Sequence, residues 1–152
     1  MIDPLSLAGT VIKTSVDIIE LCDKIESIIN RPKLVGQELN GFRSRLTAFA
    51  NFLKSLQNTI ERISTSITGD GDGLHNCFES MSGSLTSAKR FVKYALNEVK
   101  KDPRKSKHGI GKYFGGTYRV QVILDLENNL SGWQQDLGLQ IQLLTYKLTS
   151  VV

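Results

Sequence analysis

The longest regular pattern in this chain is an apolar seam that runs from Val35 to Ile67. Apolar side chains recur there at alternating spacings of four and three residues, with mostly polar or charged residues between them. This spacing places them along one side of an α-helix, which would be roughly 50 Å long at about 1.5 Å of rise per residue. A helix so long, with one narrow apolar side, needs partner helices of similar length. The seam consists of Val35, Leu39, Phe42, Leu46, Phe49, Leu53, Leu56, Ile60, Ile63 and Ile67.

The first 30 residues predict such a partner. Asp3 and Pro4 suit a helix start, since Asp caps free amide groups and Pro is preorganised for the first helical position, and Arg31-Pro32 ends the helix. Its apolar residues form two stripes, so the helix is either buried on both sides or has a second use for its exposed side. One stripe contains Leu5, Ala8, Ile12, Val16, Ile19, Cys22 and Ile29, and the other contains Leu7, Val11, Ile18, Leu21, Ile25 and Ile28.

Two further helices follow a glycine-rich turn at 69–73. A seam from Leu74 to Val99 predicts the third helix, although the serines and Gly83 in its first half favour a kink or fraying there. Residues 102–116 contain Pro103 and four glycines and are predicted as a loop. Residues 118–126 alternate as a strand would, but a helical seam continues to Leu148 and a lone strand would have no partner, so helix is predicted throughout.

These segments predict an all-α fold: an antiparallel up-down four-helix bundle with long helices in one domain, residues 1–152. The expected helices span about 4–30, 34–67, 74–101 and 117–150. Cys22 and Cys77 fall on apolar seams, so we expect small, reduced core residues of an intracellular protein, with disulfide pairing as the alternative. Because the last helix is still in progress at the final residue, the chain is interpreted as the N-terminal part of a longer receptor. We expect no metal and no cofactor.

Three candidate ligand-binding patterns in the chain depart from the residues that each pattern requires. A calcium loop counted from Asp70 would have Leu74 where an oxygen ligand is required and His75 where glycine is required. The segment 106–114 resembles a phosphate loop but has Ser106 in place of the first glycine and Tyr113 in place of Ser or Thr. Neither histidine has a metal-ligand companion at helical spacing. We therefore expect that the protein is not an enzyme.

Positive charge is concentrated between residues 89 and 112. This window holds nine of the chain's 19 basic residues and two acidic residues. On a helix, three of the lysines fall within roughly 40° of one another, so the end of the third helix and the following loop should form one positive surface. A solvated face, anionic lipid and nucleic acid are the alternatives, and no base-stacking or groove-reading module supports nucleic acid. The basic residues are Lys89, Arg90, Lys93, Lys100, Lys101, Arg104, Lys105, Lys107 and Lys112.

The opening sequence, Met-Ile-Asp-Pro-Leu-Ser-Leu-Ala-Gly-Thr-Val-Ile, resembles the N-terminal domains of fungal NOD-like (STAND) receptors, many of which begin with Met-x-Asp-Pro-Leu-Ser-x-Ala. Within that group it is most similar to the HeLo-like domains, which resemble the four-helix bundle of mixed lineage kinase domain-like protein. The resemblance implies a cytoplasmic cell-death effector of fungal innate immunity that moves to the plasma membrane on activation. An upstream receptor would oligomerise the bundle, and its N-terminal helix would then enter the membrane.

Carried onto this chain, the resemblance assigns membrane insertion to the start of the first helix and contact with anionic lipid to the nine basic residues. Lys13 and Asp17 interrupt the apolar start, which favours insertion as an oligomer or attachment at the interface over a simple spanning helix. The alternative function is a signalling adaptor of a NOD-like receptor that makes only protein contacts. The expected membrane-inserting residues are Leu5, Leu7, Ala8, Gly9, Val11 and Ile12.

Overall fold

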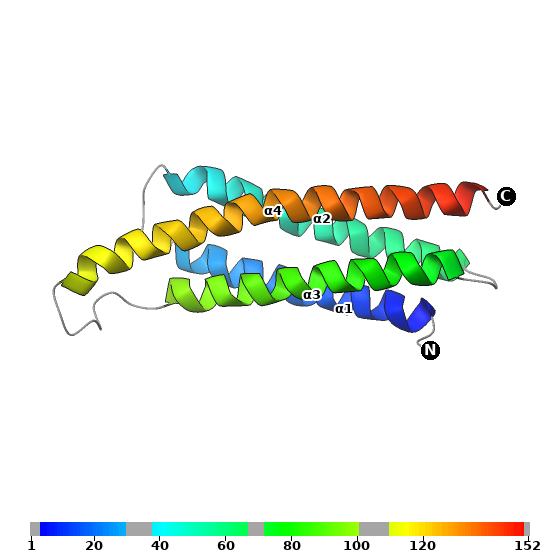
Figure 1. Ribbon diagram of the computed structural model, residues 1–152, viewed down its shortest axis with the longest axis horizontal. Helices are drawn as coiled ribbons and strands as arrows, with labels where there is room; N and C mark the ends of the chain where they lie inside the picture. Colours follow the sequence, from blue (N-terminus) through cyan, green and yellow to red (C-terminus); the bar gives the residue numbers. More distant parts are fainter. Residues whose placement is uncertain (1–3, 30–37, 67–71, 101–109, 151–152) are drawn as a thin grey trace.

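The protein folds into four α-helices that share one apolar core, and the described residues contain no β-strand (Figure 1). The helices are α1 (Pro4–Ile29), α2 (Glu38–Ser66), α3 (Asp72–Lys100) and α4 (Ile110–Ser150). The structure is a computed structural model that describes residues 4–29, 38–66, 72–100 and 110–150. Side chains are described within these ranges except at 4–5, 29, 38–40, 65–66, 72–73, 110–121 and 147–150.

The four helices have a definite order around the core. Helix α1 lies against α2 and α3, and α4 lies against the same two helices, so α1 and α4 face each other diagonally. Figure 1 shows both chain termini at the same end of the molecule, and α4 reaches past α1 and α3 at the other end. The order around the bundle is therefore α1, α2, α4, α3.

The predicted seams form the core. Every described seam residue of α2, from Phe42 to Ile63, is at most 9% exposed, and the α3 seam is buried from Cys77 to Val99. On α4, Leu126, Leu130, Leu137 and Leu144 are buried. These burials confirm the helical period, because only that period places residues four and three apart on one side.

The wide apolar arc of α1 is used for burial on both sides. Val11, Ile18 and Ile25 of one stripe are fully buried, and Ala8 and Cys22 of the other are 1% exposed. Ile12 and Ile19 are partly buried against the same core. No described apolar residue of α1 is among the exposed large side chains. Because α1 lies between α2 and α3, both stripes have a neighbour to cover them.

Two predictions, one of a helix boundary and one of a kink, differ from the structure. Helix α4 begins at Ile110, so residues 110–116, predicted as loop, are helical. Glycine lowers helix propensity by about 1 kcal/mol relative to alanine but keeps its amide hydrogen, so glycines weaken a helix without stopping it as proline does. Helix α3 also continues through Ser80 to Ser84 without a break. Met81 and Leu85 are fully buried on that stretch, and their packing outweighs the low propensity of the residues around them.

Both cysteines are free and buried, as the seams predict. Burial raises the pKa of the Cys22 thiol to about 12, and the carboxylates of Asp23 and Glu26 add to this effect. The thiolate is the nucleophile, so Cys22 should be inert to alkylation while α1 stays packed. Cys22 is therefore a native reporter of whether α1 leaves the core.

Candidate functional site

The stretch expected to enter membranes faces the core in this structure. Leu7, Ala8 and Val11 are between 0% and 6% exposed, and Ile12 is partly buried against them. Only Gly9 is exposed, and the side chain of Leu5 lies outside the described residues. Contact between this stretch and a membrane would therefore require α1 to leave its place between α2 and α3.

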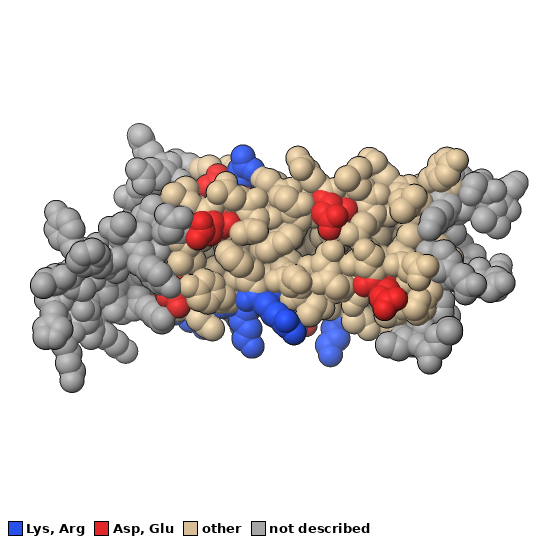
Figure 2. Space-filling view, in the orientation of Figure 1, with Lys and Arg blue, Asp and Glu red and all other residues tan. Residues whose placement is uncertain are grey.

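Four of the nine predicted basic residues lie on the described part of α3. Arg90, Lys93 and Lys100 are exposed, and Lys89 is half-buried. We call these four residues the α3 basic surface. Figure 2 shows most of the visible Lys and Arg atoms along the lower edge of the molecule, where α3 and α1 lie in Figure 1, and others at the upper edge, while acidic groups are scattered over the same face. The side chains of the remaining five basic residues lie outside the described residues: Lys101, Arg104, Lys105, Lys107 and Lys112.

The α3 basic surface is tied to α1 by an ion pair. The Nζ atom of Lys89 donates a hydrogen bond to Oδ2 of Asp17 at 2.9 Å. Both side chains are partly exposed, at 40% and 32%. One of the predicted lipid-binding lysines therefore also holds the helix that is predicted to move. No sequence pattern predicts this pair, because the two residues lie 72 positions apart.

We expect the Lys89–Asp17 pair to add only about 0.2–1 kcal/mol to stability, because solvent screens partly exposed ion pairs. A double-mutant cycle with Lys89→Gln and Asp17→Asn, followed by urea unfolding, measures this coupling. In 1 M salt, where the Debye length is about 3 Å, the coupling should shrink toward zero. A coupling that persisted in high salt would show that the two positions interact through packing instead.

An aromatic chain connects the core to the α3 basic surface. The rings of Phe49 and Trp133 lie 6.1 Å apart, Trp133 and Phe91 lie 5.7 Å apart, and Phe91 and Tyr94 lie 6.1 Å apart. Tyr94 is 44% exposed and follows Lys93 directly. A tyrosine among cations suits a membrane interface, where its ring meets apolar chains and its hydroxyl meets water. Sequence reasoning did not assign Tyr94 to this surface.

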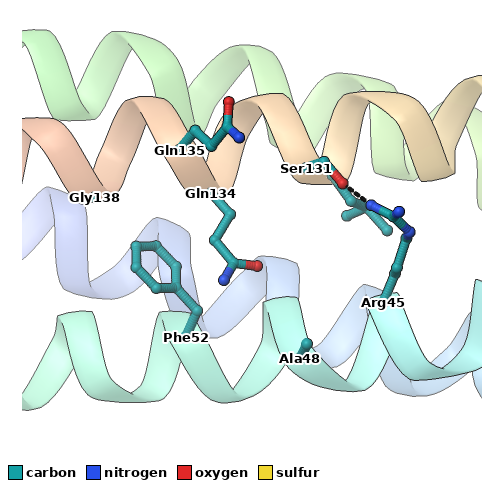
Figure 3. Close-up of a pocket in the computed structure, with 8 residues that line it drawn as sticks. Arg45, Ala48, Phe52, Ser131, Gln134, Gln135 and Gly138 are labelled. Atoms are coloured by element: carbon teal, nitrogen blue, oxygen red, sulfur yellow. Dashed lines mark hydrogen bonds between the residues drawn. The ribbon is translucent and has the colours of Figure 1, made fainter.

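An open groove lies between α2 and α4. It has a volume of about 510 Å³. Figure 3 shows Phe52 and Gln134 pointing into the space between the two helices, and Arg45 reaching from α2 to the hydroxyl of Ser131. Arg45 also pairs with Glu127 at 3.1 Å. Because Ala48 and Gly138 supply little or no side chain, the two helices leave space between them. The groove is lined by Arg45, Ala48, Phe52, Leu130, Ser131, Gln134, Gln135 and Gly138.

Replacing Gly138 should stabilise the protein. A Cβ atom at Gly138 would meet nothing within 4 Å, and alanine lowers the conformational entropy of the unfolded chain. We expect Gly138→Ala to gain about 0.5–1 kcal/mol of unfolding free energy, measured by urea titration. Gly83→Ala on α3 is the matched control and should gain a similar amount, since its Cβ atom would also meet nothing within 4 Å and it lies outside the groove. A loss of stability in Gly138→Ala alone would mean that the groove closes in solution.

A polar cluster joins α3 to α4. The hydroxyl of Ser84 donates to Oδ2 of Asp136 at 3.1 Å, and Nε2 of Gln140 donates to the same oxygen at 3.0 Å. These bonds orient α4 against α3. The cluster contains no histidine, cysteine or second carboxylate, so it offers neither a general base nor a metal site.

The described residues contain no group of three or more side chains that could hold a metal ion. Over the same residues, no helix is long and apolar enough to span a bilayer. The chain matches no protein-family model, no curated protein and no solved structure.

Proposed function

We propose that this bundle is a cell-death effector that binds anionic membranes when it is oligomerised. In this proposal the α3 basic surface contacts lipid headgroups, and the N-terminal part of α1 then enters the membrane or its interface. The upstream signal is an attached or separate NOD-like receptor, and the protein acts without catalysis. The observation that carries the proposal is the Lys89–Asp17 ion pair, which joins the α3 basic surface to α1, the helix proposed to enter the membrane.

The ion pair suggests how headgroup binding is coupled to α1. A lipid phosphate that binds Lys89 competes with the Asp17 carboxylate, and each basic residue near an anionic membrane contributes about 1 kcal/mol of attraction. That is comparable to the strength of a partly exposed ion pair. Headgroup binding would therefore weaken one link between α1 and α3. The apolar residues of α1 that leave the core would need a new apolar environment, and the bilayer supplies one.

The proposal includes an up-and-down antiparallel course for the four helices. The colours in Figure 1, which follow the sequence, run in opposite directions along consecutive helices, and this supports it. Because α1 packs on α3 and α2 packs on α4, this course makes two of the neighbouring pairs parallel. Helix α1 then has only α2 as an antiparallel neighbour.

Alkylation of Cys22 tests the release of α1. In a Cys77→Ala variant, Cys22 is the only thiol, and it is 1% exposed. We expect phosphatidylserine vesicles to accelerate its alkylation and to leak an entrapped dye, and phosphatidylcholine vesicles to do neither. The effect should increase when a fused module forces oligomerisation.

The reverse variant controls for general unfolding. In Cys22→Ala, the only thiol is Cys77, which is buried on α3. If phosphatidylserine vesicles accelerate the alkylation of both thiols equally, the whole bundle is unfolding and the proposed release of α1 is wrong. If neither thiol responds and no dye leaks, even with forced oligomerisation, the membrane function is wrong.

A second candidate function is a signalling adaptor that makes only protein contacts. The exposed apolar side chains of α4, Leu139 and Leu143, favour it, because such side chains on a helix surface suit a protein partner. In that case the α3 basic surface would meet an acidic partner or another domain of the same receptor. A salt-resistant complex together with no membrane recruitment in cells would support the adaptor over the effector.

A further inference from the structure

The side of α4 that points away from the core carries exposed apolar residues. Leu139, Leu143 and Tyr146 are 66%, 49% and 70% exposed. Their spacing of four and three places them in one row on the helix, while Leu137 and Leu144 are buried on the opposite side. Helix α4 therefore has a second seam, which faces solvent in the monomer.

The chemistry of this seam suits contact with itself. Between Gly132 and Tyr146 the one charged residue is Asp136, and residues 137–146 contain no charged side chain, so the seam carries little charge that would repel a second copy. Gly132 precedes Leu139 by two turns, is exposed, and would offer open space to a Cβ atom. An antiparallel pair of α4 helices centred on Leu139 would place Tyr146 of one copy over Gly132 of the other. The largest exposed side chain of the seam would then meet its smallest residue.

We propose that this outward seam (Gly132, Leu139, Leu143 and Tyr146) binds the same seam of a second copy of this chain, with the two α4 helices antiparallel and the two-fold axis at Leu139. Asp136 decides the direction. In a parallel pair it would face Asp136 of the second copy, whereas in the antiparallel pair it lies level with Gln142 and roughly 9 Å along the helix axis from Asp136 of that copy. A charged partner would find no complementary charge in residues 137–146.

The size of the seam sets the strength of the contact. From residue 132 to residue 146 it is roughly 20 Å long, and three exposed apolar side chains cover much less than the roughly 800 Å² per partner of a standard interface. The pair is therefore weak in dilute solution. It becomes populated when copies are tethered, since linking raises the effective concentration to about the millimolar range.

Disulfide trapping tests the geometry. A cysteine introduced at the two-fold axis, Leu139→Cys, should cross-link two copies at least about tenfold faster than Asn58→Cys, an exposed control on α2. The background is low because both native cysteines are buried. The double variant Gly132→Cys with Tyr146→Cys should also cross-link, while Gly132→Cys alone should not. Fast cross-linking of Gly132→Cys alone would show a parallel pair and overturn the proposed geometry.

Sedimentation velocity over a concentration series tests the association itself. The wild type should associate as its concentration rises, and Leu139→Glu should associate at least about tenfold more weakly, since it puts two carboxylates together at the axis. Because Leu139 is 66% exposed, this variant should keep its fold, which circular dichroism checks. Equal cross-linking of Leu139→Cys and Asn58→Cys, or equal association of Leu139→Glu and wild type, would overturn the proposal. These readouts use no lipid, so they can fail while the membrane function holds, and the reverse is also true.

Discussion

Phe49→Ala is expected to remove about 3–5 kcal/mol of unfolding free energy, which is the usual loss when a buried aromatic side chain is truncated. Phe49 is 0% exposed on α2 and contacts the Trp133 ring of α4, which in turn contacts Phe91 of α3. Its loss leaves a cavity where three helices meet. A domain of this size has about 5–15 kcal/mol of stability in total, so the variant should unfold at a much lower urea concentration.

Phe52→Ala is the matched control for this prediction. It makes the same chemical change on the same helix, three residues further on, but Phe52 is only partly buried and lines the groove between α2 and α4. We expect less than half of the Phe49 loss, because part of that side chain is already in contact with water. Equal losses for the two variants would mean that the groove is closed in solution and that Phe52 belongs to the core.

Burial along each helix followed from the sequence because it depends on local periodicity. The spacing of Phe42, Leu46 and Phe49 by four and three residues already places them on one side of a helix. The same reasoning predicted buried, free cysteines. It also left two uses open for the wide arc of α1, and the position of α1 between α2 and α3 supports burial.

The features that join different helices did not follow from the sequence. The Lys89–Asp17 pair and the groove between α2 and α4 depend on which helices are neighbours. The apolar stripes do not predict this, because several orders of the four helices around the core would bury the same stripes. Helix α4 shows a second reason. Its inward seam accounts for Leu137 and Leu144, whereas Leu139 and Leu143 lie outside that seam and no second pattern in the sequence predicts their exposure. Apolar residues outside a seam mark a second surface only when the structure shows them exposed.

The burial of Leu7 changes how the membrane proposal has to be tested. Leu7 is 6% exposed, so Leu7→Glu would place a carboxylate in the core and destabilise the fold as well as any membrane contact. A loss of membrane leakage in that variant would have two explanations. Exposed residues of the α3 basic surface separate them, because their substitution leaves the core intact.

The triple variant Arg90→Glu, Lys93→Glu and Lys100→Glu is therefore expected to lose at least about 100-fold in affinity for phosphatidylserine vesicles. Each exposed basic residue contributes about 1 kcal/mol near an anionic surface, and about 1.4 kcal/mol corresponds to a factor of ten. Removing three such contributions accounts for roughly 100-fold, and the added carboxylates repel the membrane further. Flotation of the protein with vesicles measures the affinity, and unfolding by urea should change little.

Net charge alone would produce a similar loss, so a second triple variant separates the two causes. Arg45→Glu, Lys54→Glu and Arg62→Glu also change exposed residues and also lower the net charge from +4 to −2, but these residues lie on α2, which packs against α1 and α4 and lies diagonally across the bundle from α3. If lipid contact is made by the α3 basic surface, this variant should keep most of its affinity at physiological salt, where charges beyond about 8 Å are screened. Equal losses in the two variants would mean that vesicles attract the whole molecule, and the α3 basic surface would then have no special role.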